Sequence, residues 1–129
     1  VDVALMDKRP DAFVGDNFGW RLETIVFLEL RRRTKVMGCD MYYYKKHPRA
    51  KGVDFVVCKG NKVIQMYQVA YDLTNAKTRK REIDSLVQAS TVTKCKEMFL
   101  ITDCERETVQ LGENIVQIIP AYEWLLQPY

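Results

Sequence analysis

The sequence predicts an α/β fold with a mixed central sheet flanked by helices, and three observations point to it. Apolar residues recur at spacings of three and four over residues 20–33, which is typical of a helix. A second helical segment follows a cap at Asn75 or Thr78 and extends to about Val92. Between and after these helices lie shorter runs that are rich in β-branched and aromatic residues and favour strands.

The chain has 129 residues, of which 47% are hydrophobic, and this suffices for one packed domain spanning residues 1–129. No apolar stretch approaches the roughly 20 residues that cross a bilayer. The first residues lack the features of a signal peptide. We therefore expect a cytoplasmic protein without membrane contact. The chain begins in the middle of an apolar pattern without methionine, and we expect it to be excised from a longer polypeptide.

The first predicted helix follows a loop over residues 7–19 and carries one polar residue on its apolar face. Its stripe consists of Leu22, Ile25, Val26, Glu29 and Leu30. Glu29 has two interpretations from the sequence, an edge residue paired with a neighbouring arginine or a functional carboxylate.

The remaining elements follow in order along the chain. We predict strands at residues 36–44, 53–57, 64–70, 96–102 and 114–119, the second predicted helix before residue 96, and a closing helix at residues 121–127. The strand at residues 96–102 is almost continuously apolar, which favours a central position in the sheet. The predicted order is helix, three strands, helix, strand, strand and helix.

Two polar residues, Asp54 and Gln68, interrupt the apolar strands of a hairpin that turns at residues 60–61. An unpaired polar group at such a position costs about 1–3 kcal/mol, so each side chain needs a partner. A three-residue loop places Asp54 opposite Gln68, whereas a two-residue loop breaks that register. The sequence leaves both alternatives open.

The net charge of +3 is modest, but the basic residues are clustered. The clusters lie at residues 31–35, 45–51 and 77–81. A single cluster is most simply a solvated surface, whereas three clusters around one hairpin favour a nucleic-acid partner, with DNA as the first candidate. The third cluster also places cations at a helix N-terminus, where a bound anion would relieve the conflict with the helix dipole.

The cysteines and the single histidine do not indicate a zinc site or a catalytic thiol. Cys39, Cys58, Cys95 and Cys104 are too widely spaced for paired zinc ligands, and His47 lies in a basic loop. We expect four reduced thiols.

Two carboxylates and one carboxamide among the predicted elements suit an oxygen-ligand site. Glu29, Asp54 and Gln68 offer the oxygen atoms that Mg²⁺ or Mn²⁺ takes in octahedral geometry. Such a site would favour attack of water on a phosphodiester.

The order of the elements and several phrases resemble the PD-(D/E)XK nuclease-like superfamily. The chain specifically resembles the domain that lies C-terminal to the ATPase module of many prokaryotic AAA-type ATPases. The matching phrases occupy residues 1–5, 23–32, 43–44, 53–57, 68–71, Thr78 with 81–83, 118–120 and 124–126. The resemblance implies a restriction-endonuclease-like αβββαβ core and an upstream ATPase in the same polypeptide.

The resemblance also implies a site, although one of its residues is replaced. Glu29 would match the helical glutamate, Asp54 the metal-binding aspartate and Gln68 the acidic member of the E-x-K pair, whereas Ala70 occupies the lysine position. That lysine normally activates water and stabilises negative charge. Lys80 is the expected substitute, and the other candidate cations are Lys77 and Lys62.

Two classes of function remain open. In the first, the domain binds nucleic acid next to a degenerate metal site, through Arg32, Lys45, Lys46, Arg49, Lys77, Arg79, Lys80 and Arg81. Any activity would then be that of a Mg-dependent deoxyribonuclease, which we do not expect from this domain alone. In the second class, the domain is a non-catalytic protein-interaction or regulatory module of the ATPase, with Asp54 and Gln68 satisfied by internal hydrogen bonds.

Overall fold

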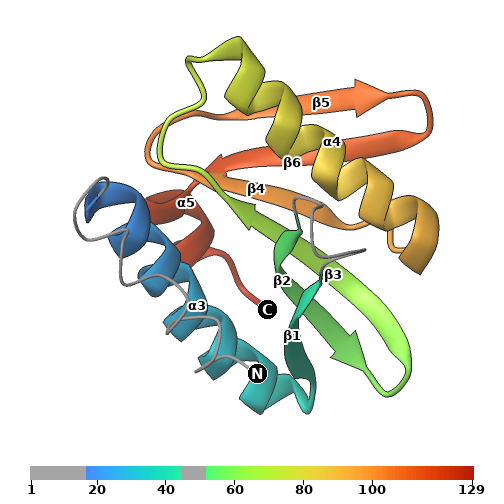
Figure 1. Ribbon diagram of the computed structural model, residues 1–129. Coiled ribbons are helices and arrows are strands. Elements are labelled where there is room, and N and C mark those ends of the chain that lie inside the picture. Colours follow the sequence, from blue (N-terminus) through green and yellow to red (C-terminus); the bar gives the residue numbers. More distant parts are fainter. Residues whose placement is uncertain (1–16, 45–51) are drawn as a thin grey trace.

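The described part of the chain forms one six-stranded sheet with helices on both faces (Figure 1). The computed structural model describes residues 17–44 and 52–129. The predicted loop at residues 7–19 lies largely outside the described residues, as do the matching phrase at residues 1–5 and the cluster at residues 45–51. The elements are α3 (Asn17–Met37), β1 (Asp40–Tyr44), β2 (Val53–Lys59), β3 (Lys62–Val69), α4 (Ala76–Thr93), β4 (Met98–Thr102), β5 (Glu107–Leu111), β6 (Asn114–Pro120) and α5 (Ala121–Leu126).

The sheet is mixed, which confirms the predicted α/β class. Its strand order is β1-β2-β3-β4-β6-β5. The central pairs β3–β4 and β4–β6 are parallel, and the remaining pairs are antiparallel. Parallel neighbours need a crossover connection, and α4 provides it between β3 and β4. As predicted, the apolar strand β4 is central.

Helix α3 packs on one face of the sheet together with α5 (Figure 1). The side chains of Leu22, Val26 and Leu30 are buried in this cluster against strand residues. The predicted stripe was wrong at Ile25, which is 46% exposed, because the buried stripe is rotated towards Phe27.

Helix α3 is longer than predicted and ends in a Schellman motif. Gly38 adopts a positive φ of 70°, and its N–H donates to Lys35 O at 3.4 Å. The N–H of Cys39 donates to Thr34 O at 2.8 Å, which completes the motif. The predicted strand at residues 36–44 was therefore wrong in its first part, since strand β1 begins at Asp40.

Helix α4 covers the opposite face of the sheet and buries Ile83, Leu86 and Ala89 against strand residues. Of the two predicted caps the structure selects Asn75, whose side chain accepts the N–H of Thr78 at 3.0 Å. This face holds the predicted polar pair.

The C-terminal part contains one strand that the sequence did not reveal. Strand β5 is an edge strand whose residues are mostly exposed, so it lacks an apolar pattern. It pairs with β6 through a turn in which Gly112 has a φ of 64°. Helix α5 follows Pro120 and buries Trp124, whereas Leu126 is 85% exposed.

Candidate functional site

The hairpin of β2 and β3 combines a two-residue turn with a β-bulge. The paired positions are Lys59 with Lys62, Cys58 with Val63, and then Val57 with Gln65, Val56 with Met66 and Phe55 with Tyr67. Strand β3 therefore carries one extra residue, Ile64, and the bulge compensates for the short turn. One further step along this register places Asp54 opposite Gln68. The turn therefore has two residues, and the expectation that such a turn breaks the register was wrong because of the bulge.

Asp54 and Gln68 join Glu82 in a set of hydrogen bonds that we call the buried network. The backbone N–H of Asp54 donates to Gln68 Oε1 at 2.6 Å, and Asp54 Oδ2 accepts the N–H of Val69 at 2.9 Å. Gln68 Nε2 donates to Gly52 O at 3.1 Å and to Glu82 Oε1 at 2.9 Å. The network thus links β2, β3 and α4.

Both the oxygen and the nitrogen of the Gln68 side-chain amide form hydrogen bonds. Its oxygen accepts one N–H and its nitrogen donates to two oxygens, so the reverse orientation would oppose like groups at all three contacts. Gln68 is fully buried, and Asp54 and Glu82 are at most 4% exposed. Buried polar groups with such partners stabilise one unique packing of the core.

Glu82 is the network member that the sequence analysis missed. It lies one turn before Leu86 on the buried stripe of α4, and its side chain is oriented towards the sheet. Spacing was the available signal, because residue 82 precedes residue 86 by four positions. Its Oε2 lies 3.9 Å from Arg81 Nη2.

Glu29 lies in a different cluster, at the junction of α3 and α5. Its carboxylate accepts from Arg32 Nε at 3.0 Å and from Arg33 Nε at 2.7 Å. Hydrogen bonding from Arg32, and then from Arg33, holds the pKa of the Glu29 carboxyl below its usual value against the effect of partial burial. Of its two interpretations, the structure shows the edge residue paired with arginine.

Arg33 connects this cluster to the C-terminal segment. The side chain is buried, and its Nη2 donates to Trp124 O at 2.8 Å and to Gln127 O at 3.2 Å. Its guanidinium lies over the rings of Trp124 and Tyr129, at 4.5 and 4.9 Å from their centroids. Arg32, a predicted nucleic-acid contact, also bonds the Tyr129 hydroxyl, so both arginines hold the chain end against α3.

The predicted metal ligands do not form one site. Asp54 and Gln68 share the sheet face of Val56 and Met66 under α4, because side chains alternate along a strand. Glu29 extends from α3, which packs on the other face. Within residues 17–44 and 52–129, no group of three or more His, Cys, Asp or Glu side chains could hold a metal ion. The implied ligand set therefore does not fit Mg²⁺ or Mn²⁺.

The start of α3, rather than its end, lies near the network end of β3. Phe18 stacks on Tyr71, just beyond β3, with ring centroids 5.5 Å apart. A helix rises about 1.5 Å per residue, so Glu23 is about 8 Å along the axis from Phe18, whereas Glu29 is about 16 Å from it. Glu23 is also buried. Of Glu23 and Glu29, Glu23 is therefore the one nearer to the end of β3 that carries the buried network.

The structure also shows where Ala70, which occupies the lysine position of the implied site, and the expected substitute cations lie. Ala70 is buried in the cluster under α4, and its N–H donates to Ile101 O at 3.0 Å. Lys80 is exposed and bonds Asp84 at 2.6 Å. Lys62 lies beside the hairpin turn, at the opposite end of β3 from Gln68, and Lys77 is exposed on α4.

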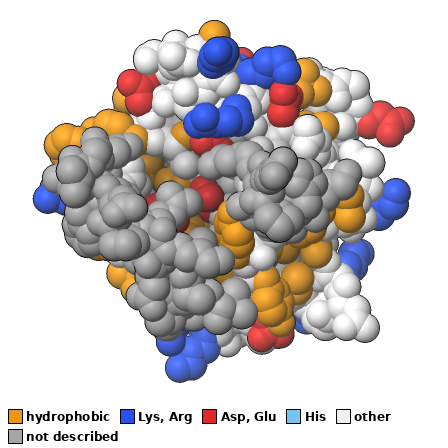
Figure 2. Space-filling model, in the orientation of Figure 1, with side chains coloured by type: hydrophobic (Ala, Val, Ile, Leu, Met, Phe, Trp, Pro, Cys, Tyr) orange, Lys and Arg blue, Asp and Glu red, His pale blue; other side chains and the backbone are white. Residues whose placement is uncertain are grey.

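Basic residues of the third cluster gather at the start of α4. Figure 2 shows Lys and Arg side chains over the upper part of the visible face, with acidic side chains beside them. Arg79 pairs with Glu107 at 2.9 Å, in addition to the pairs of Lys80 and Arg81 described above. Lys45, Lys46 and Arg49 lie outside the described residues.

The four cysteines are free thiols, as predicted. Burial raises the pKa of the Cys58 and Cys95 thiols, which lowers their thiolate fraction and hence their nucleophilicity. No helix in the described part of the chain has the length and apolar character needed to cross a membrane.

Comparison with known proteins identifies the family. Residues 18–124 match the model of a family described as a domain of unknown function, DUF4143. An uncharacterised protein of Methanocaldococcus jannaschii is 35% identical over 116 residues, which cover 85% of this chain and 25% of the relative. The chain thus spans about a quarter of the length of that curated relative. No solved structure matches the chain. On the match over residues 18–124, the chain belongs to the DUF4143 family.

Proposed function

We propose that this domain is a non-cleaving, nucleic-acid-binding module of a larger protein. Its core would be of the PD-(D/E)XK type, with the metal site replaced by the buried network. The observation that carries the non-cleaving part of the proposal is Gln68, whose amide is committed at both ends to protein groups at the position of the acidic ligand.

Hydrolysis of a phosphodiester needs ligands for a divalent ion and a nearby cation. Among the described residues, this site supplies neither. A divalent ion requires accessible oxygen ligands, whereas the buried Gln68 Oε1 accepts the N–H of Asp54 and Asp54 Oδ2 accepts the N–H of Val69. Stabilising the developing negative charge requires a cation, and the buried Ala70 supplies none. The network instead supports a structural role.

Nucleic-acid binding rests on the exposed cations at the start of α4. The first turn of this helix contains basic residues and no acidic residue, so its dipole and its charges both favour an anion. Exposed ion pairs such as Lys80–Asp84 contribute only about 0–1 kcal/mol, and a phosphate can therefore compete for the lysine.

The larger protein is proposed from the length of the relative and from the resemblance. The matched region is 25% of that protein, which leaves most of its chain for other domains. We propose an upstream AAA-type ATPase in the cytoplasm as the parent chain, with this domain as the module that contacts nucleic acid.

Binding of labelled duplex and single-stranded DNA across a salt series tests the proposal. We expect log K to fall linearly with log salt, and the double substitution Lys77→Glu with Lys80→Glu should reduce the slope by about 2. The matched control is Lys59→Glu with Lys62→Glu at the hairpin turn, which has the same charge change and should retain binding. Absence of binding at low salt would refute the proposal, and so would an equal loss in the control.

Incubation with plasmid and Mg²⁺ or Mn²⁺ tests the absence of cleavage. We expect no nicking by the wild-type domain. Nicking that disappears in the Asp54→Ala variant would assign catalysis to this site and contradict the non-cleaving part of the proposal.

A second candidate is a protein-interaction module, which the outer surface of α3 favours. Phe18, Ile25, Leu28 and Val36 are large apolar side chains that are each at least 46% exposed. Apolar residues gathered on one helix are typical of interaction surfaces. If DNA binding fails while the domain binds the remainder of its parent chain, this second function is the better description.

A further inference from the structure

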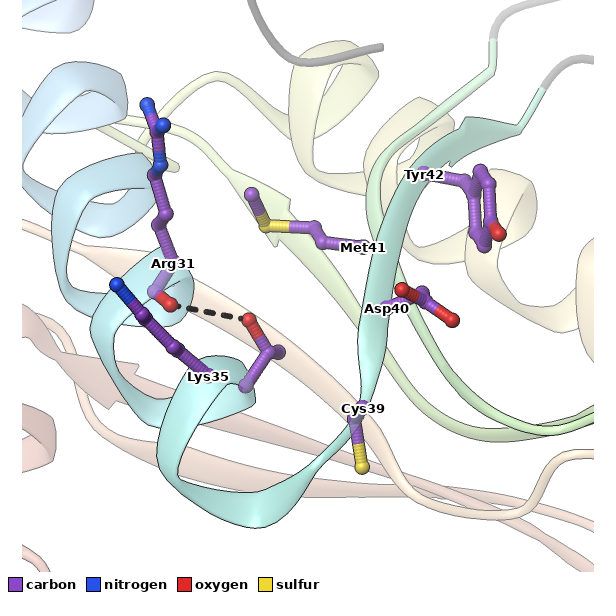
Figure 3. Close-up of a pocket in the computed structure, with 7 residues that line it drawn as sticks. Arg31, Lys35, Cys39, Asp40, Met41 and Tyr42 are labelled. Carbon is purple, nitrogen blue, oxygen red and sulfur yellow. Dashed lines mark hydrogen bonds between the residues drawn. The ribbon is translucent and has the colours of Figure 1, made fainter.

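A pocket of about 500 Å³ opens between the last turns of α3 and strand β1, away from the buried network (Figure 3). Arg31 and Lys35 extend from α3 along one wall. Met41 extends from β1 towards the helix, whereas Asp40 and Tyr42 lie on the other side of the strand. A helix wall and a strand edge therefore border the same pocket.

Strand β1 is the outermost strand of the sheet on this side. It pairs with β2, and within residues 17–44 and 52–129 no strand lies beyond it. An edge strand presents backbone N–H and C=O groups to which an extended chain can add as a further strand. Its length of five residues accommodates a short segment.

The two cations of the helix wall outnumber Asp40, the one acidic residue that lines the pocket, and they define the charge of that segment. Arg31 and Lys35 are one helical turn apart, and both are exposed. A segment that lies along β1 would meet positive charge from the helix and an apolar surface from Met41.

We propose that this pocket binds an extended acidic peptide segment, which adds to the outer edge of β1 and places its carboxylates against Arg31 and Lys35. The strand edge distinguishes this ligand from a phosphate backbone, because backbone-to-backbone pairing requires a peptide. The proposal does not depend on nucleic-acid binding at the start of α4.

Fluorescence anisotropy with three labelled peptides tests the proposal on the whole chain. The first peptide alternates glutamate and valine, the second replaces glutamate with lysine, and the third is the first with N-methyl groups on alternate backbone nitrogens. We expect the first to bind, and the other two to bind at least about tenfold more weakly, since one loses the charge and the other the ladder hydrogen bonds.

Substitutions and a local probe assign the site. Arg31→Glu with Lys35→Glu should weaken the acidic peptide at least about tenfold, whereas Lys59→Glu with Lys62→Glu should not. The methyl NMR signal of Met41 should shift with bound peptide, while the buried Met66 and Met98 serve as internal controls. Amides of β1 should gain protection from hydrogen exchange.

Three results would overturn the proposal. One is equal binding of the acidic and basic peptides, and another is binding without protection of β1. The third is displacement of the peptide by duplex DNA, combined with an equal loss of DNA affinity in the Arg31 and Lys35 double variant, which would make the pocket a phosphate site. DNA binding that depends on Lys77 and Lys80 alone leaves this proposal intact, so the two functions fail separately.

Discussion

Among single residues, Gln68 decides what the hairpin can do. Replacing it by glutamate introduces a carboxylate but removes both donated hydrogen bonds and adds a buried negative charge beside Glu82. We expect Gln68→Glu to lower the free energy of unfolding at pH 7 by about 3 kcal/mol. Urea denaturation measures this, with the exposed Gln88→Glu as control.

The pH dependence of the Gln68→Glu variant gives a sharper test. Burial and the neighbouring carboxylate raise the pKa of an introduced carboxyl in the folded state, so its destabilisation should shrink as the pH falls and the group protonates. If millimolar Mg²⁺ instead restored the stability of the variant at pH 7, one substitution would have created a metal site. Our structural interpretation of the network would then be wrong.

Glu29 makes a separate contribution to the stability of the folded state, and this contribution depends on pH. Its pKa in the folded state lies below the usual value of 4.5, so the stabilisation is complete above that value and is lost as the pH falls through the folded pKa. We expect Glu29→Gln to be less stable than the wild type at pH 7 and to show a weaker loss of stability on acidification. Thermal unfolding at a series of pH values checks this. Parallel curves for the two proteins would contradict the assignment.

Among the elements, the β2–β3 hairpin carries its bulge at Ile64. Deleting Ile64 removes the extra residue, and regular pairing with the same two-residue turn then keeps Gln68 opposite Asp54, so we expect the folded state to be retained. Adding one glycine after Gly60 to the deletion variant should also retain the fold, because a three-residue loop gives the same register. Circular dichroism and urea denaturation measure both variants. Loss of the folded state in the deletion variant would show that the bulge itself is required.

The elements also show which features the sequence can predict. The stripe of α4 and the alternation in the hairpin are local patterns, and they correctly predicted a helix and two strands. The end of α3 depends on the left-handed conformation of Gly38, and the exposed strand β5 pairs only through β6, so neither gives a hydrophobic pattern. The sequence left open whether Asp54 and Gln68 are neighbours, because it did not reveal the bulge that brings them together. Glu82 joins them only through the docking of α4.

At the scale of the whole molecule, one sheet supports two separate apolar clusters. Strands β2, β3 and β4 supply residues to both the cluster under α3 and α5 and the cluster under α4. Loss of either cluster exposes strands that the other requires, so we expect one cooperative unfolding transition. Tryptophan fluorescence follows Trp124 in the first cluster together with Trp20 on α3, and far-UV circular dichroism follows all elements. Their urea midpoints should coincide, and a fluorescence change well before the loss of helix signal would contradict the prediction.

The pairing of a short turn with a bulge has a consequence for how related chains can vary. Asp54 and Gln68 are 14 positions apart, and they face the same way because side chains alternate with a period of two. Removing one residue preserves this arrangement when the bulge disappears, and adding one residue preserves it when the turn lengthens to three residues. The turn and the bulge together, rather than loop length alone, are therefore the features to compare when a hairpin of this kind is aligned with its relatives.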